Sequence, residues 1–428
     1  MGLKIVEARD RGALAGLYAG GWDPPQAVRD AVAAIIADVR TRGDEALLAY
    51  SRRFDDPNAT LERLRVEVPA EAEAESLVPR PIAEGLRLAH RRVREFHERQ
   101  RPTDLISTDP DGTINALLYQ PLGSVGAYVP GGTAVLPSSV IMTVTPAKLA
   151  GVQRIVVATP PRRDGTVDPA ILYACRICGV DELYAIGGAQ AIAALAYGTA
   201  TIASVDKIVG PGNVWVTEAK RQVFGRCGID GLAGPSEVLV VADATAQPKL
   251  VAGEMLAQAE HDPLARVATV STEHALLEAV ADLLEGEFVR ETGRSEIVES
   301  VLSRNAYLIH ARSRSEIIEV IRDFAPEHLS LQVSDPWELI PSIRNAGAIF
   351  VGPDTPVAAG DYIAGSNHVL PTAGAARYAS GLRTADFYRT MSLVENSRTR
   401  MHADREILAA LAEFEGLPAH ARTALMRE

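Results

Sequence analysis

The sequence predicts an α/β protein built on parallel sheets. Apolar strand-like runs alternate with glycine turns and helical runs at intervals of roughly 25 residues, which is typical of βαβ units. The pattern occurs in two blocks, one over about 123–212 and one over about 232–351. Each glycine turn follows a strand, so we expect it at the carboxyl end of that strand, where open α/β sheets bind ligands.

The expected elements follow in chain order. Residues 1–23 are expected as a short arm, and apolar periodicity predicts helices over 25–54 and 81–100. Strands are expected over 114–119, 123–129, 155–161, 182–188 and 207–212, with helices over 138–150, 171–179 and 189–198 between them. The second block predicts strands over 238–241, 265–272 and 306–310 and around Gly347, with helices over 249–262, 273–290 and 313–323. After about 383 the sheet pattern stops, and a helical tail is expected, strongest over 403–415.

Composition excludes several classes of protein. The chain has 428 residues, 47% of them hydrophobic, and a net charge of −12. This length supports more than one core, and the acidic balance argues against nucleic acid or an anionic membrane as the main partner. The N-terminal residues do not resemble a signal peptide, and no uncharged apolar run reaches about 18 residues. We therefore expect a cytoplasmic protein that acts on a small molecule.

Two familiar motifs are incomplete or have a simpler explanation. Cys175 and Cys178 form a C-x-x-C, but they sit at helical spacing among apolar residues, which favours buried small hydrophobes over a zinc or redox pair. The nearest match to G-x-G-x-x-G begins at Gly210 and fails at its last position, and no P-loop motif is present. A dinucleotide suits the predicted sheet, but these residues alone do not demand one.

A candidate metal half-site lies at the end of one predicted helix. Gln258 and His261 are three residues apart, so on a helix they share a face, and Pro263 favours a helix end close by. An amide oxygen and an imidazole nitrogen are suitable ligands for a metal such as Zn²⁺. The alternative is that His261 only interacts with the carbonyls at the end of its own helix.

Three further histidines lie in or beside loops rich in glycine or proline. They are His328 beside Glu327, His368 seven residues after Asp361, and His420 five residues after Glu415. Each carboxylate also has a structural alternative: a helix start for Glu327, a turn for Asp361 and a capped tail for Glu415. Two of these residues, Asp361 and His420, would add to the half-site. The resulting nitrogen and oxygen ligand set, suited to Zn²⁺ or Mn²⁺, is Gln258, His261, Asp361 and His420.

With these segments collected, the chain resembles the histidinol dehydrogenase family almost from end to end. The resemblance is densest in GAYVPGG, TPAKLAGV, GGAQAIAALAYGT, DKIVGPGN, GIDGLAGPSE, AQAEHDP, APEHL, NAGAIFVG, GDYIAGSNHVLPT and EGLPAH. It implies oxidation of L-histidinol through L-histidinaldehyde to L-histidine, with reduction of two NAD⁺ and one zinc ion per site.

The resemblance also implies residue roles. Zinc ligands are expected at Gln258, His261, Asp361 and His420. The general-base pair is expected at Glu327 and His328. Substrate contacts are expected at Ser236, His328, His368 and Glu415 together with the metal ligands, and NAD⁺ contacts at Tyr128, Gln190 and Asn213.

The domain organisation is likewise implied by the resemblance. It comprises an N-terminal arm (1–23), one Rossmann-like α/β domain carrying the zinc and catalytic residues (24–127 and 239–382), an inserted NAD-binding α/β domain (128–238), and a helical tail (383–428). The tail is expected to be exchanged in a homodimer, so that His420 and Glu415 complete the site of the other subunit. The segment 218–230 also resembles zinc-dependent paralogues that oxidise sulfonated diols. The HDP after Glu260, the SNHVLPT segment and Glu415 favour the histidinol enzyme.

Overall fold

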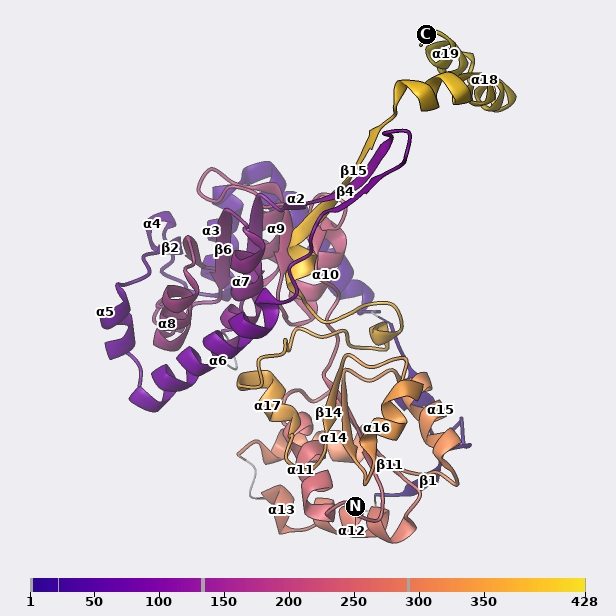
Figure 1. Cartoon of the computed structure of the whole chain (residues 1–428). Coiled ribbons are helices and arrows are strands. Elements are labelled where there is room, and N and C mark those ends of the chain that lie inside the picture. Colours follow the sequence, from indigo (N-terminus) through magenta and orange to yellow (C-terminus); the bar gives the residue numbers. More distant parts are fainter. Residues whose placement is uncertain (1–2, 22, 132–134, 291–292, 428) are drawn as a thin grey trace.

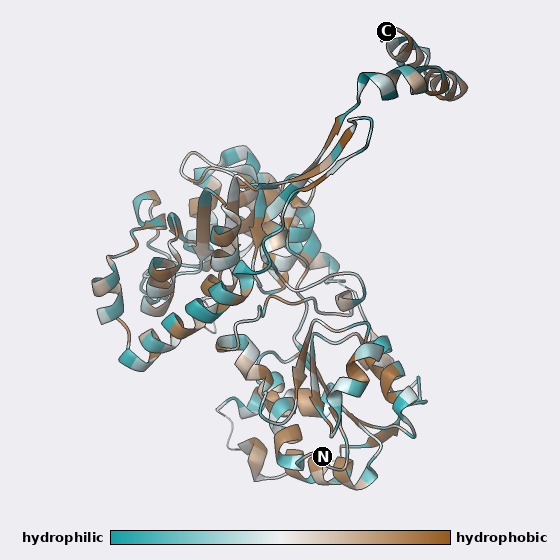
Figure 2. Ribbon diagram, in the orientation of Figure 1, coloured by the Kyte–Doolittle hydropathy of each residue, from teal (hydrophilic) through white to brown (hydrophobic). Residues whose placement is uncertain are grey.

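The computed structural model describes residues 3–21, 23–131, 135–290 and 293–427. Two six-stranded sheets form two separate layered units, and a third sheet of three strands leads into a projecting tail (Figure 1). Apolar residues concentrate in the strands of both six-stranded sheets (Figure 2). Gly132, the last residue of the predicted glycine turn at 126–132, lies outside the described residues. Within the described ranges, no helix is long and apolar enough to cross a membrane.

The first sheet has the strand order β2-β7-β6-β5-β8-β9. Its strands are β2 (Arg65–Val66), β5 (Ser124–Tyr128), β6 (Arg154–Thr159), β7 (Glu182–Ala185), β8 (Lys207–Val209) and β9 (Gly228–Ile229). All pairs are parallel except β2 with β7. Successive side chains of a strand point to opposite faces, so Ile155 and Val157 join one core and Val156 and Ala158 the other. Burial on both faces explains the continuous apolar run that predicted β6.

Helices cover both faces of the first sheet. One core includes residues of α5 (Glu71–Ser76), α6 (Arg80–Glu98), α7 (Pro137–Ala150) and α8 (Pro169–Cys178). The other includes residues of α2 (Gln26–Arg42), α3 (Asp44–Phe54), α4 (Leu61–Leu64), α9 (Gly188–Tyr197) and α10 (Val214–Val223). Cys175 and Cys178 are buried free thiols on α8, as predicted.

The second sheet is parallel throughout, in the order β1-β12-β11-β10-β13-β14. Its strands are β1 (Ile5–Glu7), β10 (Glu237–Ala242), β11 (Arg266–Ser271), β12 (Ala306–His310), β13 (His328–Gln332) and β14 (Ala348–Val351). One face is covered by α11 (Pro248–Ala259), α12 (His274–Glu285), α13 (Glu287–Arg290), α14 (Ser295–Arg304) and α17 (Val357–Tyr362). The other is covered by α1 (Ala15–Tyr18), α15 (Arg314–Phe324) and α16 (Pro336–Leu339).

The predicted assignment of 24–127 to the same domain as 239–382 is wrong for the regular elements of that segment. Helices α2 and α3 pack in one core of the first sheet, α6 packs in the other, and β5 is a central strand of that sheet. The arm also differs from expectation, because β1 extends the second sheet by pairing with β12. The first sheet therefore holds β2 and β5 to β9, and the second holds β1 with β10 to β14.

The third sheet carries the tail. Strand β15 (Tyr388–Glu395) pairs antiparallel with β4 (Ile114–Pro121), which pairs with β3 (Leu105–Thr108). Helices α18 (Arg398–Phe414) and α19 (Pro418–Leu425) follow and project away from both sheets (Figure 1). The tail was predicted to be helical throughout, and this prediction is wrong for the part before Arg398, which contains β15. The side chains of β15 are mostly exposed on both faces, so the strand lacks the apolar alternation that marks a buried strand.

Candidate active site

The three predicted cofactor residues meet at the carboxyl edge of the first sheet. Tyr128 ends β5, Gln190 lies in the first turn of α9 after β7, and Asn213 caps α10 after β8. The Tyr128 hydroxyl accepts a hydrogen bond from the Gly188 N–H at 3.2 Å. Asn213 Oδ1 accepts from Trp215 N at 3.1 Å and from Val216 N at 3.2 Å. The helix N-termini at this edge are suited to an anionic cofactor.

A tight glycine turn places Asn213. Gly210 has a φ of +108°, and a Cβ at this position would lie 2.2 Å from the Tyr128 carbonyl oxygen, so only glycine fits. The buried Lys220 and Asp230 form an ion pair beside this turn. Lys220 Nζ donates to Gly210 O at 2.9 Å, and Asp230 Oδ2 accepts from Gly210 N at 2.7 Å. The ion pair therefore holds both polar backbone groups of the glycine.

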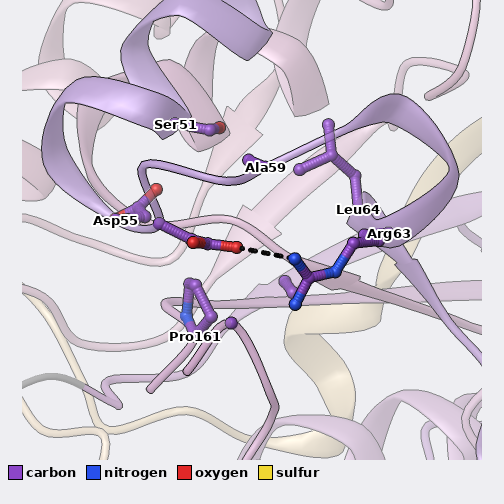
Figure 3. Close-up of a pocket in the computed structure, with 9 residues that line it drawn as sticks. Ser51, Asp55, Ala59, Arg63, Leu64 and Pro161 are labelled. Carbon is purple, nitrogen blue, oxygen red and sulfur yellow. Dashed lines mark ion pairs between the residues drawn. The ribbon is translucent and has the colours of Figure 1, made fainter. Parts of the chain in front are cut away.

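Asp55 is a residue at this edge that the sequence did not single out. Its Oδ2 accepts from Gly187 N and from Gln190 Nε2, both at 3.1 Å, so it orients the Gln190 amide. Burial raises the pKa of Asp55. Asp55 and Ser51 line a small pocket that also contains the ion pair between Asp56 and Arg63 (Figure 3). No local sequence signal marks Asp55, because its partners lie more than a hundred residues away.

The predicted catalytic residues lie at the amino edge of the second sheet. His328 is the first residue of β13 and Glu327 precedes it, while Ser236 immediately precedes β10. The crossover helix α11 runs back across the sheet, so its end, with Gln258 and His261, returns to this edge. The predicted cofactor residues thus lie at carboxyl ends of strands, as expected, whereas the predicted catalytic residues of the second sheet lie at amino ends.

His328, the predicted general base, has a ring whose orientation is fixed by a hydrogen bond. Its ring is buried, and Nδ1 lies 3.0 Å from the Glu237 carbonyl oxygen. A carbonyl can only accept, so Nδ1 carries the proton and Nε2 keeps a free lone pair. Burial lowers the pKa of His328, while the negative charge of Asp361 acts in the opposite direction.

Glu327 is buried beside His328 and is held by the strand that carries Glu237. Its Oε2 accepts from the Glu237 N–H at 2.9 Å and lies 3.5 Å from His328 Nδ1. Burial raises the pKa of Glu327 well above its usual value, and the charges of Glu237 and Asp361 raise it further. Such a carboxylate is a stronger base when ionised than an exposed one.

Three of the four predicted metal ligands belong to this edge. Gln258 is 3% exposed, and among the described residues its Nε2 has no hydrogen-bond partner. The oxygen and nitrogen of an amide exchange places when the side chain flips, so an unpartnered amide end fits a metal ligand. The charges of His261 and Asp361 both act on the pKa values of His328 and His368, which places all four groups in one neighbourhood.

Glu254 joins the two elements that carry these ligands. Glu254 lies on α11 one turn before Gln258, and its Oε2 accepts from the N–H of Val357 at 3.1 Å. Val357 is the first residue of α17, and Asp361 follows one turn later. The carboxylate therefore sets the position of Asp361 relative to Gln258. Burial raises the pKa of Glu254, and the charge of Asp361 adds to that shift.

The loop around His368 connects the edges of the two sheets. His368 Nδ1 donates to the Asp361 carbonyl at 2.9 Å, and Nε2 lies 3.5 Å from the hydroxyl of Ser139, in the first turn of α7. Asn367 Nδ2 donates to Met142 O at 2.8 Å and lies 3.3 Å from His97 Nε2. The carboxyl edge of the first sheet and the amino edge of the second thus share one polar region.

Glu415 and His420 do not reach this region within one chain. Both side chains are exposed, Glu415 at the end of α18 and His420 on α19, on the projecting tail (Figure 1). In the described part of the chain, no three His, Cys, Asp or Glu side chains form a metal-binding cluster. Within the described chain, His261 and Asp361 therefore share a neighbourhood near the end of α11, where Gln258 lies, and His420 lies apart from it on the tail.

The parallel-sheet fold, with helix N-termini at one edge and a buried histidine nearby, is the arrangement expected of an oxidoreductase of the dehydrogenase type. The family model described as histidinol dehydrogenase matches residues 23–428. The chain belongs to the histidinol dehydrogenase family, as the sequence predicted.

Relatives and a solved structure agree with this assignment. The histidinol dehydrogenase of a Synechococcus species is 44% identical, covering 92% of this chain and 91% of the relative. That of Gluconobacter oxydans is 45% identical, covering 96% and 95%. The crystal structure of histidinol dehydrogenase from Elizabethkingia anophelis aligns with a TM-score of 0.92 at 32% identity, covering 100% and 98%. These relatives give no support to the sulfonated-diol alternative.

Proposed function

We propose that this chain oxidises L-histidinol through L-histidinaldehyde to L-histidine, using NAD⁺ and zinc. The observation that carries the proposal is the hydrogen bond from His328 Nδ1 to the Glu237 carbonyl, which leaves Nε2 free to accept a proton in a buried site. Family membership supports the choice of substrate.

In the alcohol step, His328 Nε2 takes the proton of the substrate hydroxyl. The lowered pKa of His328 keeps the ring neutral, and therefore able to accept a proton, at neutral pH. When bound, NAD⁺ supplies the hydride acceptor, and zinc supplies a charged centre that orients the amino alcohol. Tyr128, Gln190 and Asn213 would contact the NAD⁺, at the carboxyl edge of the first sheet.

In the aldehyde step, Glu327 removes a proton from the water that hydrates the aldehyde. His328, having released its first proton to solvent, then accepts a second hydroxyl proton, this time from the hydrate, while the hydride would pass to a second NAD⁺. Ser236 and His368 would contact the substrate from the chain that holds the base pair, and Glu415 from the partner's tail.

Gln258, His261 and Asp361 would hold the zinc from one chain and His420 from the other. The unpartnered Gln258 amide supports this assignment. An amide, two imidazoles and a carboxylate make a ligand set that suits zinc.

The same arrangement requires a homodimer. Exposed apolar side chains line the tail helices: Ile407 is 63% exposed, Leu411 61% and Phe414 91%. A cluster of this kind favours burial against a second copy of the chain. A chain that ends at Glu395 is expected to be a monomer by light scattering and to form no NADH. A truncated dimer of full activity would contradict the exchanged tail.

A cytoplasmic location remains a prediction. It is supported by the biosynthetic role of the family and by the three buried free thiols.

An absorbance assay of NADH tests the proposed function. The zinc-loaded protein should form about two NADH per L-histidinol and yield L-histidine. A sulfonated diol assayed in parallel should give no NADH. NADH formation with the diol and none with L-histidinol would overturn the proposal.

A further inference from the structure

Glu237 contacts both Glu327 and His328, yet its side chain has no part in the proposed mechanism. The residue is fully buried at the start of β10. Its backbone N–H binds the Glu327 carboxylate, and its backbone carbonyl binds His328 Nδ1. Its own carboxylate accepts from the Glu327 N–H at 3.3 Å and from the Ala373 N–H at 3.1 Å.

The Glu237 and Glu327 contacts form a reciprocal clamp. The strand pairing of β10 with β13 ends at the pair Val238 and His328. One position earlier, each glutamate accepts the backbone N–H of the other, so side chains replace the strand ladder where it ends. This fixes both the backbone and the carboxylate of Glu327.

Arg266 completes the clamp from the neighbouring strand. It stands opposite Glu237 in the register of β10 with β11, and its guanidinium pairs with Glu237 Oε1. The same guanidinium donates to the carbonyls of Leu17, at 3.0 Å, and of Ala19. The Arg266 cation thus balances the buried Glu237 carboxylate and links the end of α1 to the residue that contacts Glu327 and His328.

We propose that Glu237, held by Arg266, is a positioning residue that sets Glu327 in place for the aldehyde step. The inference rests on the proposed function. The inference predicts different effects on the two steps. The backbone carbonyl of Glu237 binds His328, whereas the side chain of Glu237 binds the backbone N–H of Glu327. Loss of the side chain should therefore spare the first oxidation and slow the second.

Single-turnover measurements of Glu237→Gln test this distinction, because glutamine has one acceptor oxygen, whereas Glu237 uses Oε1 for Arg266 and Ala373 and Oε2 for Glu327. The first equivalent of NADH from L-histidinol should form at close to the wild-type rate, and the second should form at least about tenfold more slowly. With added L-histidinaldehyde, kcat should fall while KM changes little, because the lesion affects a reacting group and not binding.

A second variant separates positioning from folding. Glu237→Leu with Arg266→Met replaces the ion pair by apolar side chains of similar size, a change that buried pairs often tolerate. The second step should stay slow in this folded double variant. A wild-type second step would mean that the ion pair serves the fold alone, and would overturn the inference.

A matched control lies in the first sheet. Arg154 pairs with Glu182 across the start of β6 and β7 and also donates to two carbonyls, those of Ala203 and Ser204. Glu182→Gln should leave both steps unchanged. If Glu237→Gln slows both steps equally, or neither, the positioning role is wrong. Inactive wild-type protein would instead refute the proposed function.

Discussion

Gly347→Ala is predicted to slow catalysis by displacing Glu327 and His328. Gly347 N donates to Pro326 O, and the next residue, Ala348, donates to Glu327 O, both at 2.9 Å. A Cβ on Gly347 would lie 2.5 Å from the Glu327 carbonyl oxygen, where real Cβ atoms keep at least 3.0 Å. The backbone must therefore move by at least about 0.5 Å, and displacements of this order cost about 10- to 100-fold in rate.

The assay is kcat for NADH formation from L-histidinol, measured beside thermal unfolding. Overpacking against a backbone should also cost about 1–3 kcal/mol of stability. Gly253→Ala is the control, because Gly253 lies in the middle of α11 and a Cβ added there would meet nothing within 4 Å. Alanine there should add about 0.5–1 kcal/mol and leave kcat unchanged. If Gly347→Ala folds and keeps kcat within about twofold, the close packing against Glu327 does not control the reaction.

Further predictions concern the base pair, the metal ligands and acid stability. His328→Asn should lose both oxidations, by about 10²- to 10⁴-fold, with full zinc content. Glu327→Gln should slow aldehyde oxidation more than alcohol oxidation; loss of zinc in either variant would contradict its role. Glu254→Ala should weaken zinc binding about 10- to 100-fold, measured by competition with a chromophoric chelator. Glu254→Gln keeps a hydrogen-bond acceptor for Val357 and should keep most of the affinity. Unchanged affinity in the alanine variant would show that Glu254 does not position the metal ligands. Burial lowers the pKa of His97, so its contribution to stability is present above pH 6.5 and is lost as pH falls through the lowered pKa. Urea unfolding at pH 7 and 5.5 should show a smaller loss for His97→Gln than for the wild type; an equal loss would exclude His97 as a cause.

Much of the fold could be predicted because its signals are local. The apolar runs of β6 and β10 are buried on both faces, as parallel strands between helices must be. Gly210 is required by close packing against the Tyr128 carbonyl, and the local pattern of a strand followed by glycine already predicted a turn there. The grouping of elements was harder, because the apolar stripe of α2 indicates burial but not the sheet against which it packs.

The less visible parts of the site depend on distant contacts. Glu237 and Glu327 are separated by 90 positions, Glu254 and Val357 by 103, and Asp55 and Gln190 by 135. No spacing in the sequence links such partners. Strand β15 was missed for a related reason, since its pairing with β4 uses backbone groups that every sequence has.

The central claim is that two chains build each site, and mixed dimers test it most directly. His261→Asn and His420→Asn should each be inactive as homodimers. Mixed dimers, purified through two different tags, would carry one site with both changes and one intact site, so about half of the wild-type NADH formation should return. Mixed dimers as inactive as their parents would show that each site draws His261 and His420 from the same chain.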